Sequence, residues 1–143
     1  MKNYDVLIIG AGPGGIFSAY ELVQGSRDLK VAVFEAGRPL EQRKCPIDGK
    51  KVKSCIGCKT CAIMNGFGGA GAFSDGKYNI TNNFGGTLHE YIGRDTAIEL
   101  MQYVDGINTA FGGSAAKLYS TANTHIKTLC VQNGLHLLDA SVR

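Results

Sequence analysis

Three glycines and one carboxylate near the N-terminus have the spacing of a dinucleotide site. The glycines form a G-x-G-x-x-G turn made by Gly10, Gly12 and Gly15. An apolar run at residues 6–9 precedes the turn, and a second run at residues 31–36 contains Glu35, about 20 residues past the last glycine. In such a unit the glycines make the tight turn, let the backbone approach a pyrophosphate and allow close helix–sheet packing. The sequence therefore predicts a strand–helix–strand unit that binds a dinucleotide.

The segment between the two runs predicts a helix that begins near Gly14 and ends at Gly25. Pro13 suits the start of this helix because its missing N–H would be unpaired there. The unpaired N–H groups of the first turn and the positive end of the helix dipole would face the phosphates. One helical face is apolar and is expected to lie against the sheet: Ile16, Ala19, Tyr20 and Val23.

Glu35 helps to choose among dinucleotides. A carboxylate at the end of the second strand accepts hydrogen bonds from a ribose 2′-OH but repels a 2′-phosphate, which argues against NADP at this site. FAD and NAD both carry an adenosine ribose, so Glu35 does not separate them. Ala19 extends the motif to G-x-G-x-x-G-x-x-x-A, a form that resembles flavoprotein families, and the unit starts as early as Tyr4. Both features favour FAD.

Four cysteines follow in a long segment, residues 37–62, that has no clean helical or strand periodicity. They form a C-x₉-C-x₂-C-x₂-C pattern made by Cys45, Cys55, Cys58 and Cys61. Four thiolates are enough to ligate one [4Fe–4S] cluster or one zinc ion. A C-x-x-C pair beside a flavin could instead exchange electrons as a dithiol. The third interpretation is a set of reduced thiols packed in a loop.

A second glycine segment, residues 66–77, reads G-F-G-G-A-G-A-F-S-D-G-K. It has few side chains to pack, so it must serve unusual dihedrals or close backbone approach. A backbone that runs along the pyrophosphate and ribityl part of FAD would need this, with the Ser74 hydroxyl as a further donor. A flexible loop is the alternative interpretation.

The rest of the chain predicts two helices and a strand. Apolar residues recur every three or four positions over residues 95–111, and a second helix is expected over residues 121–132. Residues 135–139 are the candidate for a third strand. We expect residues 1–92 to form the first part of a dinucleotide-binding domain with a cysteine-rich insert at 37–62. Residues 93–143 would then begin a helical second domain, and the chain would be the N-terminal part of a longer protein.

Composition excludes several function classes. A net charge of +3 is too small to indicate nucleic-acid binding, and no run of about 18 apolar residues indicates a membrane span. The N-terminus lacks the pattern of a signal peptide, so a cytoplasmic location is expected. The histidines stand alone in the sequence, and no Ser–His–Asp or paired-carboxylate arrangement is readable, so no catalytic side chain is assigned.

The order of these motifs resembles the N-terminal part of bacterial FAD-dependent dehydrogenases, within the wider NAD(P)/FAD-dependent oxidoreductase family. The likeness covers nearly the whole chain, and the G-F-G-G-A-G-A-F-S-D-G-K segment is its most specific part. It implies an α/β, Rossmann-like FAD-binding domain with a parallel sheet, in a flavin-dependent oxidoreductase that acts on a small-molecule substrate. NAD(P)H is a candidate electron donor.

The resemblance also implies a set of cofactor contacts. The first glycine turn and the end of the second strand would hold the ADP half of FAD, and Arg43 and the second glycine segment would provide secondary contacts. The candidate residues are Gly10, Ala11, Gly12, Pro13, Gly14, Gly15, Glu35, Ala36, Arg43, Gly69, Ala70, Gly71, Ser74 and Asp75.

Overall fold

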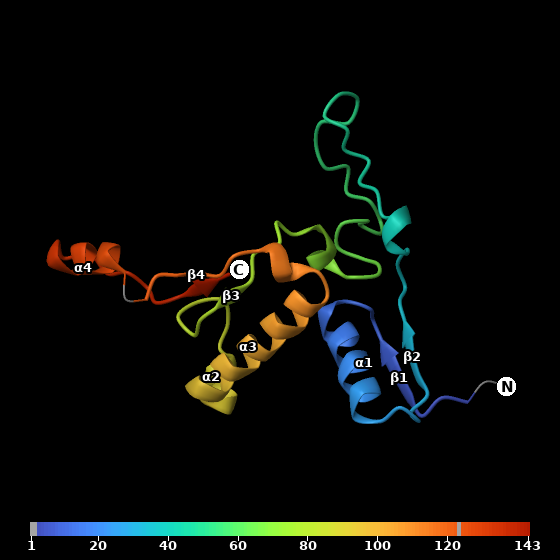
Figure 1. The fold of residues 1–143 in the computed structure, drawn as a ribbon. Helices are drawn as coiled ribbons and strands as arrows, with labels where there is room; N and C mark the ends of the chain where they lie inside the picture. The colour runs from blue at the N-terminus through green and yellow to red at the C-terminus, as the bar shows by residue number, and fades with distance from the viewer. Residues whose placement is uncertain (1–2, 123) are drawn as a thin grey trace. The chain divides into compact units, whose positions relative to one another are not determined.

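The computed structural model describes residues 3–122 and 124–143 and shows a mixed α/β chain (Figure 1). The chain divides into two compact units, Met1–Asp75 and Gly76–Arg143, called unit 1 and unit 2 below. The boundary between the units falls between Asp75 and Gly76, inside the second glycine segment. The domain division predicted near residue 92 stays a prediction. Unit 1 therefore contains the first glycine turn, the second glycine segment as far as Asp75, and the four clustered cysteines.

Unit 1 begins with the predicted strand–helix–strand unit. It consists of β1 (Val6–Ile9), α1 (Pro13–Gly25) and β2 (Val31–Phe34). The strands are parallel and in register, with Val6 opposite Val31 and Ile9 opposite Phe34. Parallel strands need a crossover between them, and α1 supplies it. The predicted elements and their order are confirmed.

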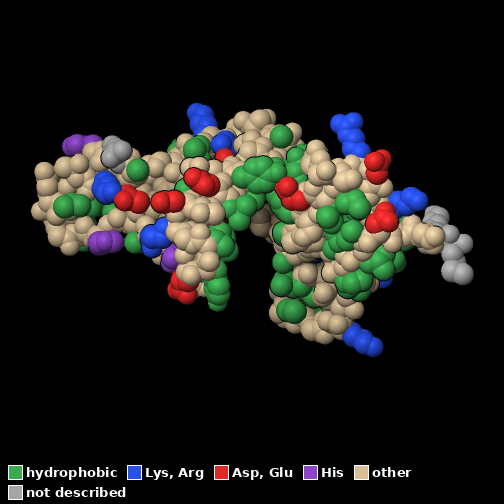
Figure 2. All heavy atoms as spheres, turned by 90° about the horizontal axis from the view of Figure 1, so that it is seen from below, with side chains coloured by type: hydrophobic (Ala, Val, Ile, Leu, Met, Phe, Trp, Pro, Cys, Tyr) green, Lys and Arg blue, Asp and Glu red, His purple; other side chains and the backbone are tan. Residues whose placement is uncertain are grey.

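Among the described residues, β1 is covered on one face only, although a continuous apolar run is typical of a parallel strand covered on both faces. Ile8 is partly buried, but Leu7 and Ile9 are 59% and 83% exposed. Successive side chains on a strand point to opposite faces, so the face that carries Leu7 and Ile9 lies open. The predicted apolar face of α1 is likewise only partly covered, because Val23 is 48% exposed. Figure 2 shows apolar side chains at the surface of the molecule.

The remainder of unit 1 is irregular, as predicted, apart from two short 3₁₀ helices, Leu40–Gln42 and Ala70–Phe73. Within the cysteine-rich segment, the Asp48 carboxylate accepts hydrogen bonds from the N–H groups of Lys50 and Val52 at 2.8 and 2.9 Å. These hydrogen bonds lower the pKa of Asp48. Asp48 thus folds the segment back on itself.

Unit 2 is built on a three-stranded antiparallel sheet of order β3-β5-β4. The sheet and helices of this unit are β3 (Asn79–Ile80), α2 (Leu88–Ile92), α3 (Arg94–Ala110), β4 (Tyr119–Ser120), α4 (His125–Gln132) and β5 (Ser141–Val142). The helix predicted over residues 95–111 is confirmed as α3. Ala97 on α3 is fully buried, and Ile80 on β3 is 7% exposed.

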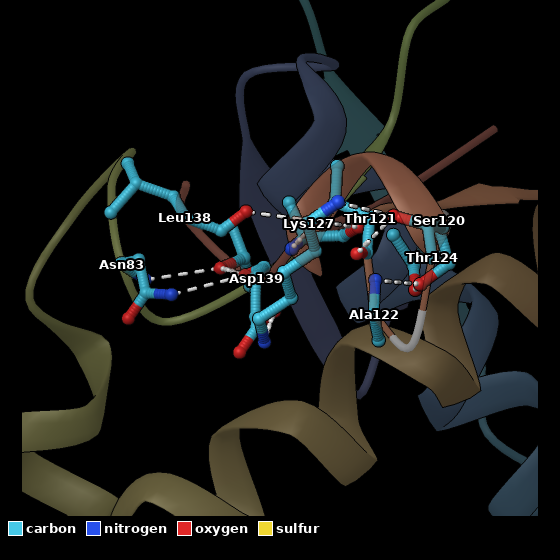
Figure 3. Close-up of polar contacts among 11 residues, drawn as sticks. Asn83, Ser120, Thr121, Ala122, Thr124, Lys127, Leu138 and Asp139 are labelled. Carbon is cyan, nitrogen blue, oxygen red and sulfur yellow. Dashed lines mark hydrogen bonds and ion pairs between the residues drawn. The ribbon is translucent and has the colours of Figure 1, made fainter. Parts of the chain in front are cut away.

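Two predictions in unit 2 need correction. The helix expected over residues 121–132 begins only at His125, because the Thr124 side chain accepts the Lys127 N–H and caps it there. Residues 135–139 do not form a strand, and β5 follows them instead. The Leu138 carbonyl accepts a hydrogen bond from the Thr121 hydroxyl, and the Asp139 carbonyl accepts one from Asn83 (Figure 3).

A charged pair joins α3 to β5. The Arg143 guanidinium donates to both carboxylate oxygens of Asp105, at 2.8 and 2.9 Å, and Asp105 is 7% exposed. Asp105 raises the pKa of Arg143 through this hydrogen bond. Burial, with a smaller contribution from the Asp105 charge, raises the pKa of nearby Tyr78. In the part of the chain that the structure describes, no helix is both long and apolar enough to span a membrane.

Candidate functional site

The candidate site lies in unit 1, at the turn between β1 and α1. Gly10 has φ +99°, and its N–H donates to the Phe34 carbonyl at 2.6 Å. A Cβ atom on Gly15 would overlap the carbonyl oxygen of Gly10 and would lie 3.3 Å from Cγ2 of Ile8. Only glycine permits both the dihedral at position 10 and the close approach at position 15. The structural roles expected for these two glycines are confirmed.

The N-terminus of α1 is left without a side-chain cap. Gly12 occupies the capping position and makes no side-chain hydrogen bond, and Pro13 begins the helix without an N–H. The first N–H groups of a helix have no acceptor within it, and the helix dipole places partial positive charge there. The turn at Gly12–Gly15 therefore presents unpaired N–H groups and positive potential without a competing side chain.

Glu35 lies directly beside this turn. Its Oε2 accepts the Ala11 N–H at 2.7 Å, and its Oε1 accepts the Gly37 N–H at 2.8 Å. The hydrogen bonds from Ala11 and Gly37 hold the pKa of Glu35 below its usual value, with smaller contributions from Gly66 and the charge of Arg43. A carboxylate offers about four lone-pair directions, which leaves Glu35 able to accept at least one further hydrogen bond.

The second glycine segment packs on the first. The Gly68 N–H donates to the Ala11 carbonyl at 2.8 Å. A Cβ on Gly69, where φ is +59°, would lie 3.0 Å from Cα of Gly12 and 3.2 Å from Cδ of Pro13. The close backbone approach inferred for this segment is present, and the first glycine turn is its partner within the protein.

Arg43 holds the second glycine segment in place. It is 3% exposed, and its three guanidinium nitrogens donate to the carbonyls of Ala62, Ile63 and Phe67 at 2.9, 2.6 and 2.5 Å. The guanidinium carbon also lies 4.7 Å from the centre of the Phe73 ring. Sequence reasoning placed Arg43 at the cofactor but missed this structural role.

The other candidate contacts surround this core of the site. Gly14 lies in the first turn of α1, and Ala36 follows β2 at the surface. Ala70 and Gly71 belong to the 3₁₀ helix, and a Cβ on Gly71 would lie 3.5 Å from Cγ of Pro13. Two further candidates, Ser74 and Asp75, come directly after this helix and are exposed. Apart from Ala36, these residues lie on the two glycine segments, which pack together.

The four clustered cysteines line one cavity of about 110 Å³. All four are free thiols, and Cys61 is the least exposed of them. Among the residues that the structure describes, no group of three or more His, Cys, Asp or Glu side chains stands ready to hold a metal. Cys130, in α4 of unit 2, is also a free thiol and is half-buried.

Unit 2 contains a separate cavity of about 310 Å³. Amide and hydroxyl groups and two charged residues line it, among them Asn82, Gln102, Ser120, Arg94 and Asp139. Among the described residues that line this cavity, no hydrogen bond joins a side-chain nucleophile to a side-chain base. We therefore assign no catalytic side chain there. Comparison of the chain with protein-family models, curated proteins and solved structures finds no significant match.

Proposed function

We propose that unit 1 binds the ADP half of FAD and that the chain is the FAD-binding portion of a flavin-dependent oxidoreductase. The observation that carries the proposal is the joining of the G-x-G-x-x-G turn to Glu35, through the Ala11 N–H. This hydrogen bond brings an uncapped helix end and a carboxylate together, which supports binding of a pyrophosphate and a ribose. In the proposed fold, β1 and β2 belong to a Rossmann-like parallel sheet.

The pyrophosphate would bind at the N-terminus of α1. Its negative charge complements the uncapped helix end at Gly12, and no side chain at Gly12 or Gly14 stands in its way. The second glycine segment borders the same place, since a Cβ on Gly69 would lie 3.0 Å from Cα of Gly12 and 3.2 Å from Cδ of Pro13. Both segments expose backbone rather than side chains, as a phosphate cradle requires.

The adenosine ribose would bind at Glu35. Glu35 is charged at neutral pH, which lies above its lowered pKa, and a charged carboxylate accepts strong hydrogen bonds from ribose hydroxyls. The same charge would repel a 2′-phosphate, so the proposal selects FAD or NAD over NADP at this site. The extended glycine motif with Ala19 favours FAD.

The bound flavin would accept a hydride or electrons from a small-molecule substrate, and the protein would supply position and electrostatics. Within unit 1, Arg43 would support the site indirectly, through its contacts with the backbone. It holds the carbonyls of Ala62, Ile63 and Phe67 and so fixes the second glycine segment against the turn. NAD(P)H is a candidate electron donor in this scheme.

Calorimetric titration of the 143-residue chain with FAD, ADP, NAD and NADP tests the proposal. We expect FAD and ADP to bind, with FAD tighter than NAD and NADP weakest. Glu35→Gln should weaken ADP by about tenfold, because one hydrogen bond to a charged group is lost. Gly106→Ala is the control, since a Cβ there meets nothing within 4 Å in α3 of unit 2.

Each outcome is decisive. A folded wild-type chain that binds neither FAD nor ADP overturns the proposal, as does a Glu35→Gln variant that binds ADP as tightly as the wild type. Binding of NAD in preference to FAD, with ADP still bound, keeps the dinucleotide site and overturns the flavin assignment. Circular dichroism of each variant confirms that the fold is retained.

A further inference from the structure

We propose that Cys45, Cys55, Cys58 and Cys61 form a four-thiolate site for a thiophilic metal centre, independent of the proposed FAD site. The observation that carries the proposal is that all four thiols line the same small cavity. The short spacings alone explain why Cys55, Cys58 and Cys61 lie together. Cys45 is ten positions away from Cys55 and is brought to them by the fold.

Hydrogen bonds join the two ends of the segment that carries the thiols. Arg43 binds the Ala62 and Ile63 carbonyls, and the Asn65 N–H donates to the Cys61 carbonyl at 2.9 Å. The first and last cysteines are therefore held near each other. Between Cys45 and Cys55, the turn at Asp48 reverses the direction of the chain. This reversal brings Cys55 back toward Cys45.

This segment has no apolar core of its own. Ile47 and Ile56 line the cysteine cavity, yet they are 42% and 62% exposed. Small segments that cannot bury enough apolar surface are commonly held by a metal or by disulfides. A metal bound by the four thiolates would supply the missing core.

The charge of the surroundings suits bound thiolates. Four thiolates with Zn²⁺ or with a [4Fe–4S]²⁺ core carry a net charge of about −2. The neighbouring cavity of about 230 Å³ shares Cys58 with the cysteine cavity and is lined by Arg38, Arg43 and Lys44. The segment also carries four further lysines: Lys50, Lys51, Lys53 and Lys59. Between Cys45 and Cys61 the one acid is Asp48, and its carboxylate accepts hydrogen bonds within its own turn.

Metal binding must draw the thiols inward, because no three of the described His, Cys, Asp or Glu side chains already stand at ligand spacing. The segment can make this movement at Gly49 and Gly57, which have positive φ and open space around them. Metal binding and local folding are commonly coupled in this way, with release of the thiol protons. The proposal thus predicts that metal orders residues 45–61.

The test is anaerobic reconstitution of the 143-residue chain with Zn²⁺ alone and, separately, with Fe²⁺ and sulfide. One metal site per chain is expected. Zinc without sulfide identifies a zinc site, and iron with acid-labile sulfide identifies a cluster; both support the four-thiolate site. The loaded segment should resist trypsin at Lys50, Lys51, Lys53 and Lys59, where the metal-free segment is cut.

Two variants make the test specific. The double variant Cys45→Ser/Cys58→Ser should lose metal and trypsin resistance, whereas Cys130→Ser in unit 2 should retain both. Equal metal content in the double variant and the wild type overturns the proposal. So does a metal-free wild type after reconstitution, with its thiols free or paired as disulfides. ADP titration of the same samples tests the proposed FAD site alone. Its result does not bear on the four-thiolate site.

Discussion

The Ala11 N–H donates to Oε2 of Glu35 at 2.7 Å, across 24 positions of sequence. This hydrogen bond ties the turn after β1 to the end of β2. The chain thereby sets the carboxylate beside the helix end. For the proposed dinucleotide, such preorganisation would reduce the cost of ordering the site on binding.

Glu35 should make the stability of unit 1 depend on pH. Its pKa in the folded chain lies below the usual value of 4.5. A carboxyl of this kind stabilises the fold above its unfolded pKa, and the stabilisation is lost as the pH falls through the folded value. We expect the difference in unfolding free energy between wild type and Glu35→Gln to be constant near neutral pH and to shrink below about pH 4.5. Urea unfolding of both chains across that range measures it.

A pH-independent difference between these two chains would contradict this assignment. Asp48 has a lowered pKa too, but it is present in both chains. Its contribution therefore cancels in the comparison, and the remaining pH dependence belongs to Glu35.

Two neighbouring glycines of the turn should respond differently to the same substitution. In Gly15→Ala the new methyl group would overlap the Gly10 carbonyl, whose backbone position is set by the Phe34 hydrogen bond. We expect a loss of about 2 kcal/mol or more in unfolding free energy from this overpacking. In Gly14→Ala the methyl group meets nothing within 4 Å, so stability should stay within about 0.5 kcal/mol. Equal stabilities in urea would contradict the close packing at Gly15.

The sequence predicted the strand–helix–strand unit well because its signals are local. Gly10, Gly15 and the apolar runs on either side define the turn without help from the rest of the chain. The boundary of α4 was missed for a local reason as well. Thr124 and Thr121 are both credible caps, and only the hydrogen bond from Lys127 to Thr124 decides between them.

The rest of the site depends on contacts that leave no mark in a sequence. Arg43 donates to backbone carbonyls, and every residue has a carbonyl, so its partners could not be read from residue types. The packing of Gly69 on Gly12 is also a contact between backbone atoms, so residue types do not reveal it. The strand predicted at residues 135–139 is absent. The side chains of Thr121 and Asn83 donate to the carbonyls of Leu138 and Asp139, which a neighbouring strand would otherwise bind.

Arg43 should be irreplaceable by lysine. Arg43→Lys keeps the charge, but one ammonium group cannot reproduce the planar guanidinium fork that meets three carbonyls. Buried carbonyls would lose their donors, at about 1–3 kcal/mol each where water does not replace them. We expect a lower thermal midpoint and faster chymotrypsin cleavage after Phe67. Arg38→Lys, at an exposed position, is the matched control, and equal effects of the two variants would contradict the role of Arg43.

The Asp105–Arg143 pair should stabilise unit 2 without affecting the proposed site in unit 1. Asp105 is nearly buried, so Asp105→Asn leaves the Arg143 guanidinium without its counter-charge and should lower the unfolding free energy of unit 2. Arg143→Gln should cost a similar amount, and the double variant should cost less than the sum, because the two residues act as a pair. Hydrogen exchange measured separately for the two units locates the effect. Additive losses, or equal loss of protection in β1 and β5, would show that the pair does not stabilise unit 2 in this way.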